Sequence, residues 1–293
     1  MVSLSHLFID KIALTIPVQS QSLQHGIAEQ LRACAEARII ESVLYGDLLL
    51  RYFLAYSIPL AGGRSAVVQI APRGDGLNYF RCEYNPSSRG LANEHPFSLI
   101  AGILFPAWAG FASSLEHARI NRMDFAIDIH GVPIDRLGVH HSSRSTFSRQ
   151  YGRDGRITGL YLGKRTSERH VVIYDKKREA RACHARILRG ERTRVEIRTT
   201  DIGPLSAVAN MRNPFSAIAI SIYPPHDADA HGYAHFLDSC RFRGVQAALH
   251  LVQNRRKRAE YRDWLNQNCT PPWWDAGAIW AQRMTATRRA LGV

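Results

Sequence analysis

Three short segments of this chain carry residue types that can break a phosphodiester bond. Tyr174 follows three apolar residues and is followed by lysines, so a phenol stands at the end of a short strand among many cations. Cations favour the phenolate, whose ordinary pKa is about 10, and they also hold nucleic-acid phosphates. Asp124, in Arg-Met-Asp, and Glu196, in Arg-Val-Glu-Ile-Arg, add carboxylates. Together the three segments predict DNA strand cleavage.

The two acidic segments are typical of half-buried strands with one charged face, because alternate side chains of a strand point to opposite sides. Asp124 and Asp128 share a face, but four residues of strand separate them by about 13 Å. We therefore expect Asp124 to bind a metal ion together with Glu196 from another strand. Oxygen ligands favour Mg²⁺ or Mn²⁺. Alternatively, the acids neutralise neighbouring arginines, as most exposed alternating charges do.

Lys176 is expected on the same strand face as Tyr174, where its charge can stabilise a phenolate or a charged transition state. The alternative is that Tyr174 is an ordinary tyrosine of the core or its rim.

The charge of the chain is concentrated in one region. The net charge is +13, and residues 144–198 hold sixteen Lys and Arg against six Asp and Glu. Such a surplus attracts polyanions and is typical of binding to backbone phosphates; a solvated basic surface without a specific partner is the alternative. The residues predicted to bind DNA are Arg122, Arg144, Arg149, Arg153, Arg156, Lys164, Arg165, Arg169, Lys177, Arg194 and Arg198.

Cysteine spacing and the N-terminus favour a protein of a reducing cytoplasm. Five cysteines lie apart, with no pair at Cys-x-x-Cys spacing, so neither a zinc knuckle nor a disulfide framework is indicated. We expect no signal peptide. The nearly uncharged stretch 96–115 is long enough for a membrane span, but its prolines favour a buried helix, or two short helices broken near Pro106.

Histidines are expected to play no part in metal binding. His140 and His141 are expected in a loop, and His231 and His235 on a helix. The helical pair has suitable spacing, but no third ligand presents itself.

The pattern along the chain predicts an α+β protein. Strands are expected at 7–17, 42–55, 66–70, 77–84, 122–129, 158–162, 169–174 and 193–199, and helices at 22–38 and from 176 to about 188. Residues 135–150 are expected to be irregular, and an apolar element is expected at 215–223. The last third is helical in pattern, at 233–253, 255–266 and 273–291. We expect an antiparallel sheet with helices on one face and an open charged surface on the other. The expected domains are 1–200 and 201–293.

The order of four motifs resembles a known family. Over residues 7–200 the chain carries a strand ended by Pro17, then Arg-x-Asp at 122–124 and Tyr-x-Gly-x-x-x-Ser at 161–167. Ile-Tyr-Asp-Lys-x-x-Glu at 173–179 and Arg-x-Glu-x-Arg at 194–198 follow. This arrangement resembles replication initiation proteins of rolling-circle elements, chiefly the gene-two proteins of filamentous phages and then plasmid replication initiation factors.

The resemblance implies a five-stranded antiparallel sheet with helices behind it, and Tyr174 as the nicking nucleophile, with Lys176 and Glu179 close behind. Asp124 and Glu196 fall on the metal-binding acids, with Asp128 as a further candidate. The implied activity is nicking of origin DNA, single-stranded or supercoiled, with a 5′-phosphotyrosyl link, a free 3′-OH and later rejoining. A host helicase and polymerase are the implied partners in a bacterial cytoplasm, without a membrane or small-molecule cofactor.

Three alternatives remain at this stage. Tyr161 and Tyr151 are rival nucleophiles, although the hairpin glycine beside Tyr161 favours a structural role. A tyrosine recombinase is disfavoured because the candidate tyrosine lies in mid-chain on a strand. A non-catalytic DNA-binding protein, such as a repressor or packaging factor, would use the basic surface alone. The role of the basic run Arg255-Arg256-Lys257-Arg258 is open: a second DNA contact or a solvated helix face.

Overall fold

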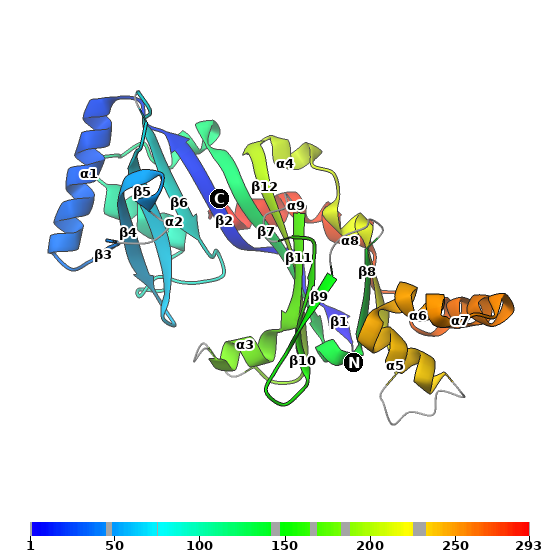
Figure 1. Ribbon diagram of the computed structural model, residues 1–293. Coiled ribbons are helices and arrows are strands. Elements are labelled where there is room, and N and C mark those ends of the chain that lie inside the picture. The colour runs from blue at the N-terminus through cyan, green and yellow to red at the C-terminus, as the bar shows by residue number, and fades with distance from the viewer. Residues whose placement is uncertain are drawn as a thin grey trace. The chain divides into compact units, whose positions relative to one another are not determined.

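The computed structural model is an α+β protein built on a large antiparallel sheet (Figure 1). It describes residues 2–44, 49–74, 76–141, 147–164, 169–182, 188–224 and 233–292. Within these ranges the main sheet has eleven strands in the order β3-β4-β5-β6-β2-β7-β12-β11-β10-β9, with β1 paired to β7. The α+β class is thus confirmed, while the expected number of about five strands was too small.

The chain divides into two compact units, each described on its own. Unit 1 comprises Met1–His6, Ile127–Ile197 and Asn213–Ala281, and unit 2 comprises Leu7–Ala126, Arg198–Arg212 and Gln282–Val293. Strands β7 (Arg119–His130) and β12 (Arg192–Pro204) contribute residues to both units. The division therefore differs from the expected boundary near residue 200, which falls inside β12.

Unit 2 contains strands of the main sheet that pair in antiparallel order. These are β2 (Phe8–Pro17), β3 (Glu41–Ser42), β4 (Tyr52–Leu60), β5 (Arg64–Pro72) and β6 (Tyr79–Tyr84). Strand β2 pairs with β6 on one side and with β7 on the other. The expected strand at 42–55 was misplaced: β3 ends at Ser42 and β4 begins at Tyr52.

Helices cover one face of the unit 2 strands. These helices are α1 (Gln21–Glu36), α2 (Pro96–Leu104), the 3-10 helix η2 (Ser113–His117), α4 (Ala207–Asn210) and α9 (Arg283–Leu291). Helix α1 lies against β4 and β5 (Figure 1). Tyr84 of β6 is buried and donates its hydroxyl to the carbonyl of Ala290 in α9. The opposite face carries Arg81 and Glu83, which are only partly buried. One face is therefore apolar and covered, and the other is charged.

The apolar stretch 96–115 forms part of this covering layer. Helix α2 ends at Leu104, just before a cis bond between Phe105 and Pro106. Phe97 and Phe111 stack on each other at 5.0 Å, and Phe111 also meets Phe80 of β6 edge to face. The expectation of short elements broken near Pro106 is confirmed. In the part of the chain that the structure describes, no helix is long and apolar enough to cross a membrane.

Unit 1 contains the remaining strands of the main sheet. These are β1 (Ser3–Leu4), β9 (Phe147–Tyr151), β10 (Ile157–Leu162) and β11 (Arg169–Asp175), with portions of β7 and β12. Strands β9, β10 and β11 pair in antiparallel order. A second, two-stranded sheet pairs β8 (Leu137–His141) with β13 (Ile218–Ile222). In the described parts of 135–150 the expectations of an irregular segment and of a loop at His140 and His141 were wrong, because alternate apolar residues let β8 pair with β13 and because residues 147–151 form β9.

Short helices complete unit 1. They are η3 (Ile134–Arg136), α3 (Lys176–Ala182), η4 (Pro214–Ala217), α5 (Ala234–Arg243), α6 (Val245–Leu251), α7 (Arg255–Asn268) and α8 (Ala276–Ala281). The expected helix at 233–253 is broken at Gly244, whose φ of +84° suits glycine and not other residues. Four described cysteines, Cys34, Cys82, Cys240 and Cys269, are free and buried; Cys183 lies outside the described residues.

Candidate functional site

Tyr174 and Glu196 share the charged face of the sheet in unit 1. Val171 and Ile173 of β11 are buried, at 3% and 0% exposure, and so are Val195 and Ile197 of β12. Because side chains alternate along a strand, burying these aliphatic residues turns the intervening positions to the other face.

The hydroxyl of Tyr174 donates a hydrogen bond to the carboxylate of Glu196. The distance from Tyr174 Oη to Glu196 Oε1 is 2.6 Å, and the Glu196 side chain is 15% exposed. An ionised carboxylate can accept hydrogen bonds but cannot donate them, so the phenolic proton points at a base. This is the contact that a nucleophile makes with its proton acceptor.

Lys176 places its charge over the ring of Tyr174. Its Nζ lies 5.6 Å from the ring centroid and 2.7 Å from the carboxylate of Glu179. The expectation that Lys176 shares the strand face of Tyr174 was wrong, because β11 ends at Asp175 and Lys176 begins α3. Asp175 caps this helix by accepting the backbone N–H of Arg178 at 3.0 Å. The helical turn then brings the ammonium back over the phenol.

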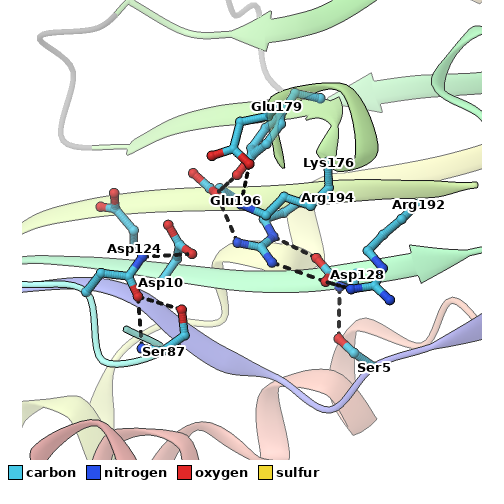
Figure 2. Close-up of polar contacts among 12 residues, drawn as sticks. Ser5, Asp10, Ser87, Asp124, Asp128, Lys176, Glu179, Arg192, Arg194 and Glu196 are labelled. Carbon is cyan, nitrogen blue, oxygen red and sulfur yellow. Dashed lines mark hydrogen bonds and ion pairs between the residues drawn. The ribbon is translucent and has the colours of Figure 1, made fainter. Parts of the chain in front are cut away.

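Arg194 links Glu196 to a second buried acid, Asp128. Figure 2 shows its guanidinium lying between the two carboxylates. Arg194 donates to Asp128 through two nitrogens, at 2.6 and 3.1 Å, and lies 4.0 Å from Glu196 Oε1. Arg192 lies 3.9 Å from the other side of Asp128, and Ser5 Oγ accepts the Asp128 backbone N–H. A bidentate pair buried in this way holds both partners in fixed orientations.

Asp124 belongs to unit 2 and has arginine partners of its own. Arg122 donates to it through two nitrogens, at 2.9 and 2.5 Å, and Arg198 lies 3.6 Å away. Asp124 and Asp128 therefore make the contacts expected if these acids neutralise neighbouring arginines.

As arranged, these carboxylates do not fit a divalent cation. Each of Asp124 and Asp128 is ion-paired to two arginines, and a guanidinium competes with a metal for the same oxygens. In the described part of the chain, no group of three or more His, Cys, Asp and Glu side chains could hold a metal ion. The metal site formed by Asp124, Glu196 and Asp128 stays a prediction, and we derive no chemical step through it.

Tyr161, the rival nucleophile, lies near the same carboxylate but directs its proton elsewhere. Its hydroxyl donates to Gln150 Oε1 at 2.7 Å, and its ring stacks on His170 at 6.0 Å. Burial, followed by the negative charge of Glu196, raises the pKa of Tyr161. A neutral amide is a poor proton acceptor, so this contact favours a structural role. Tyr151 is half exposed, at the end of β9.

Two further residues of this site belong to none of the sequence motifs that predicted it. His170 is buried under the ring of Tyr161, and Gly159 pairs directly with Tyr174 in the β10–β11 register. A Cβ on Gly159 would lie 3.0 Å from the Tyr161 ring, so glycine leaves room for that ring. The sequence signal for this packing is a glycine two residues before a tyrosine, because that spacing places both residues on the same face of the strand.

The residues predicted to bind DNA fall into different environments. Arg153, Arg156 and Lys164 are exposed, whereas Arg194 is buried against Asp128. Arg156 and Lys177 line a cavity of about 350 Å³ in unit 1. Arg149 donates to the carbonyl of Phe242. Three predicted residues lie outside the described residues: Arg144, Arg165 and His231. The described part also leaves out the side chains of Arg169, His140 and His141. His235 lies on α5.

Comparison with known proteins finds a distant likeness. No family model and no curated protein matches the chain. A matching solved structure is described as that of a rolling circle replication initiator protein from Geobacillus stearothermophilus. The two sequences are 14% identical, and the match covers 83% of this chain and 98% of that chain, with a TM-score of 0.42. Similarity at this level carries no functional argument, so the proposal below rests on the chain's own residues.

Proposed function

We propose that this protein nicks DNA through Tyr174 and acts as an initiator of rolling-circle replication. The observation that carries the proposal is the 2.6 Å hydrogen bond from the Tyr174 hydroxyl to Glu196, beneath the ammonium of Lys176. The resemblance of the Ile-Tyr-Asp-Lys-x-x-Glu segment to rolling-circle initiators supports the same tyrosine as the nucleophile.

The cleavage step transfers one proton and exchanges one bond at phosphorus. Glu196 takes the phenolic proton while Tyr174 Oη attacks the scissile phosphate, and the bond from phosphorus to the 3′ oxygen breaks. The products are a 5′-phosphotyrosyl link and a free 3′-OH, once the departing 3′ oxygen has gained a proton from water. Lys176 neutralises charge that develops on the phosphate.

Rejoining is the same step in reverse. The 3′-OH of the other strand end loses its proton to water and attacks the phosphorus, the bond from phosphorus to Tyr174 Oη breaks, and the departing phenolate regains its proton from Glu196. No outside energy source is needed, because the covalent link conserves the phosphodiester bond energy. Between the two steps, in the cytoplasm of a bacterial host, a host helicase would unwind the duplex and a host polymerase would extend the free 3′-OH.

A requirement for Mg²⁺ or Mn²⁺ stays a separate prediction, because Asp124 and Asp128 are ion-paired to arginines and no step of the cleavage above depends on a metal. An assay with each cation and with EDTA tests it separately from the tyrosine. Equal cleavage in EDTA would remove the metal and leave Glu196 as the proton acceptor.

The substitution Tyr174→Phe tests the nucleophile. We expect it to abolish covalent attachment and to retain DNA binding, because only the phenolic oxygen is removed. The substrate is a pool of single-stranded oligonucleotides of randomised sequence, labelled at the 3′ end. A 5′-phosphotyrosyl link leaves this label on the protein in a denaturing gel, and fluorescence anisotropy measures binding.

Tyr161→Phe and Tyr151→Phe are the matched controls, and both should still become labelled. Continued labelling of Tyr174→Phe would contradict the proposal, and loss of labelling in Tyr161→Phe alone would assign the nucleophile to Tyr161. Binding without labelling in the wild-type protein would favour the alternative of a non-catalytic DNA-binding protein.

A further inference from the structure

Helix α7 of unit 1, which packs with α5 and α6, presents an exposed stripe of residues that the nicking chemistry does not use. Helix α6 has seven residues, three connecting residues follow, and α7 has fourteen. A short helix, a brief turn and a longer helix is the order of a helix-turn-helix motif, whose second helix enters the major groove of DNA.

The connection between α6 and α7 is fixed by specific contacts. Asn254 caps α7 by accepting the backbone N–H of Lys257 at 3.0 Å. The guanidinium of Arg258 donates twice to the carbonyl of Val252, at 3.0 and 2.8 Å. Arg258 therefore stabilises the turn between the two helices. The other basic residues of α7 are exposed to solvent.

The apolar side of α7 is already occupied by its own protein. Leu265 is 5% exposed, within the core cluster of these helices. Trp264 stacks on Tyr233 at 4.4 Å, and Tyr261 stacks on Phe236 of α5 at 4.3 Å. A basic amphipathic helix can also bind a lipid surface, but only through a free apolar face. These contacts therefore favour a polar partner over a membrane.

The stripe consists of Arg255, Ala259, Arg262 and Asn266, which are all exposed. Their spacing of four, three and four residues places them on one side of the helix, within about 60° of arc and over about 16 Å of its length. Arginine pairs with guanine and asparagine with adenine in the major groove, and a small residue between them permits close approach.

The acids of α7 leave this stripe clear. Glu260 accepts a hydrogen bond from Tyr233 at 3.2 Å, toward the packed side of the helix. Asp263 is exposed, but it lies about 70° around the helix from the centre of the stripe. Arg256 continues the basic surface beyond Asp263 and suits a contact with phosphate.

We infer that α7 is a recognition helix that binds the major groove of duplex DNA, at a site separate from Tyr174. This inference rests on the proposed function, because a nickase that acts at one origin needs a means of reading duplex sequence. Arg255, Arg262 and Asn266 are the specificity-determining residues, and Arg256 contributes affinity.

The test is the double variant Arg255→Gln, Arg262→Gln, which keeps the helix propensity and removes two charges. Binding to a short DNA duplex of random sequence is measured by fluorescence anisotropy over a range of KCl concentrations. We expect at least about a tenfold loss of affinity. We also expect the slope of log K against log salt concentration to become less negative by about two. The matched control, Arg288→Gln, Arg289→Gln, removes two exposed charges from α9 and should change both quantities less.

A second measurement separates reading of sequence from general charge. Rounds of selection from a randomised duplex pool should enrich a common sequence with the wild-type protein but not with the Arg255, Arg262 variant. Equal losses in the α9 control, or equal affinity for duplex RNA, would overturn the inference. Circular dichroism melting confirms that each variant is folded.

Labelling by the single-stranded pool keeps this inference distinct from the proposed function. The stripe variant should still form the covalent adduct, because single strands present no major groove. A wild-type protein that is labelled by single strands but does not bind duplex DNA would refute the recognition helix alone. Absence of labelling in the wild-type protein would refute the nicking proposal alone.

Discussion

Glu196 has two phenols as neighbours, and the difference between them explains why one is the proposed nucleophile. The hydroxyl of Tyr174 donates a hydrogen bond to the carboxylate, whereas the hydroxyl of Tyr161 donates a hydrogen bond to Gln150. Burial and, after it, the negative charge of Glu196 raise the pKa of Tyr161. In the proposed mechanism, one acid accepts the proton of one tyrosine and disfavours ionisation of the other.

Substitution of Glu196 by Gln tests this assignment. We expect the rate of adduct formation to fall by about 10²-fold or more, since a positioned general base contributes on that scale. DNA binding should be retained, and the rise of rate with pH on the acidic side should disappear. Glu191→Gln, which changes a more exposed carboxylate just before β12, is the control. A Glu196→Gln rate close to that of the wild-type protein would show that the hydrogen bond has no role in proton transfer.

At the scale of elements, the charged face of unit 2 is stabilised across its strands. Lys11 of β2 and Arg81 of β6 both contact Glu83, at 2.8 and 2.5 Å. Burial alone favours the neutral acid, but these two cations outweigh it and lower the pKa of Glu83 to about 2. The network joins β2, β5 and β6, because Arg81 also donates to Gln69.

This pKa predicts the pH dependence of a Glu83→Gln variant. Because the pKa is lower in the folded than in the unfolded state, the ionised acid stabilises the fold at neutral pH. This contribution is complete above the unfolded pKa and is lost as the pH falls toward about 2. We expect the variant to lose about 2 kcal/mol of unfolding free energy at pH 7, and the difference to shrink below about pH 4. Urea unfolding at a series of pH values measures it; a difference that stays constant from pH 7 to pH 3 would contradict the assignment.

Local patterns were a good guide to individual elements and a poor one to their pairing. Alternation predicted the two faces of β12, and other local patterns predicted the strand at residues 7–17 and the helix that begins at Lys176. It missed β8 and β9, because a short strand needs a partner and the partner of β8, β13, lies nearly eighty residues away. Gly244 divides α5 from α6 through a positive φ, which periodicity does not report.

At the scale of the whole molecule, antiparallel pairing explains why the compact units do not follow the order of the chain. Each compact unit takes segments from both sides of residue 200, because β7 and β12 contribute to both. A composition change after residue 200 marks a change of local structure and does not reveal which strands share a core. The candidate site also depends on strand pairing, because Tyr174 and Glu196 meet only where β11 and β12 are neighbours in the sheet.

The concentration of positive charge is a property of the whole chain, but its parts differ in what they can do. Some of the arginines in residues 144–198 hold acids in place, as Arg194 holds Asp128. Others, such as Arg153 and Arg156, are exposed and can face a polyanion. A count of charges predicts a nucleic-acid partner, and only the contacts distinguish the arginines that support the site from those at the surface.

The most direct measurement is to map the peptide that carries a nucleotide after reaction with the single-stranded DNA pool. Protease digestion and mass spectrometry of the labelled protein should find the nucleotide on the peptide that contains Tyr174. A nucleotide on the peptide of Tyr161 or Tyr151, or a wild-type protein that carries none, would contradict the account.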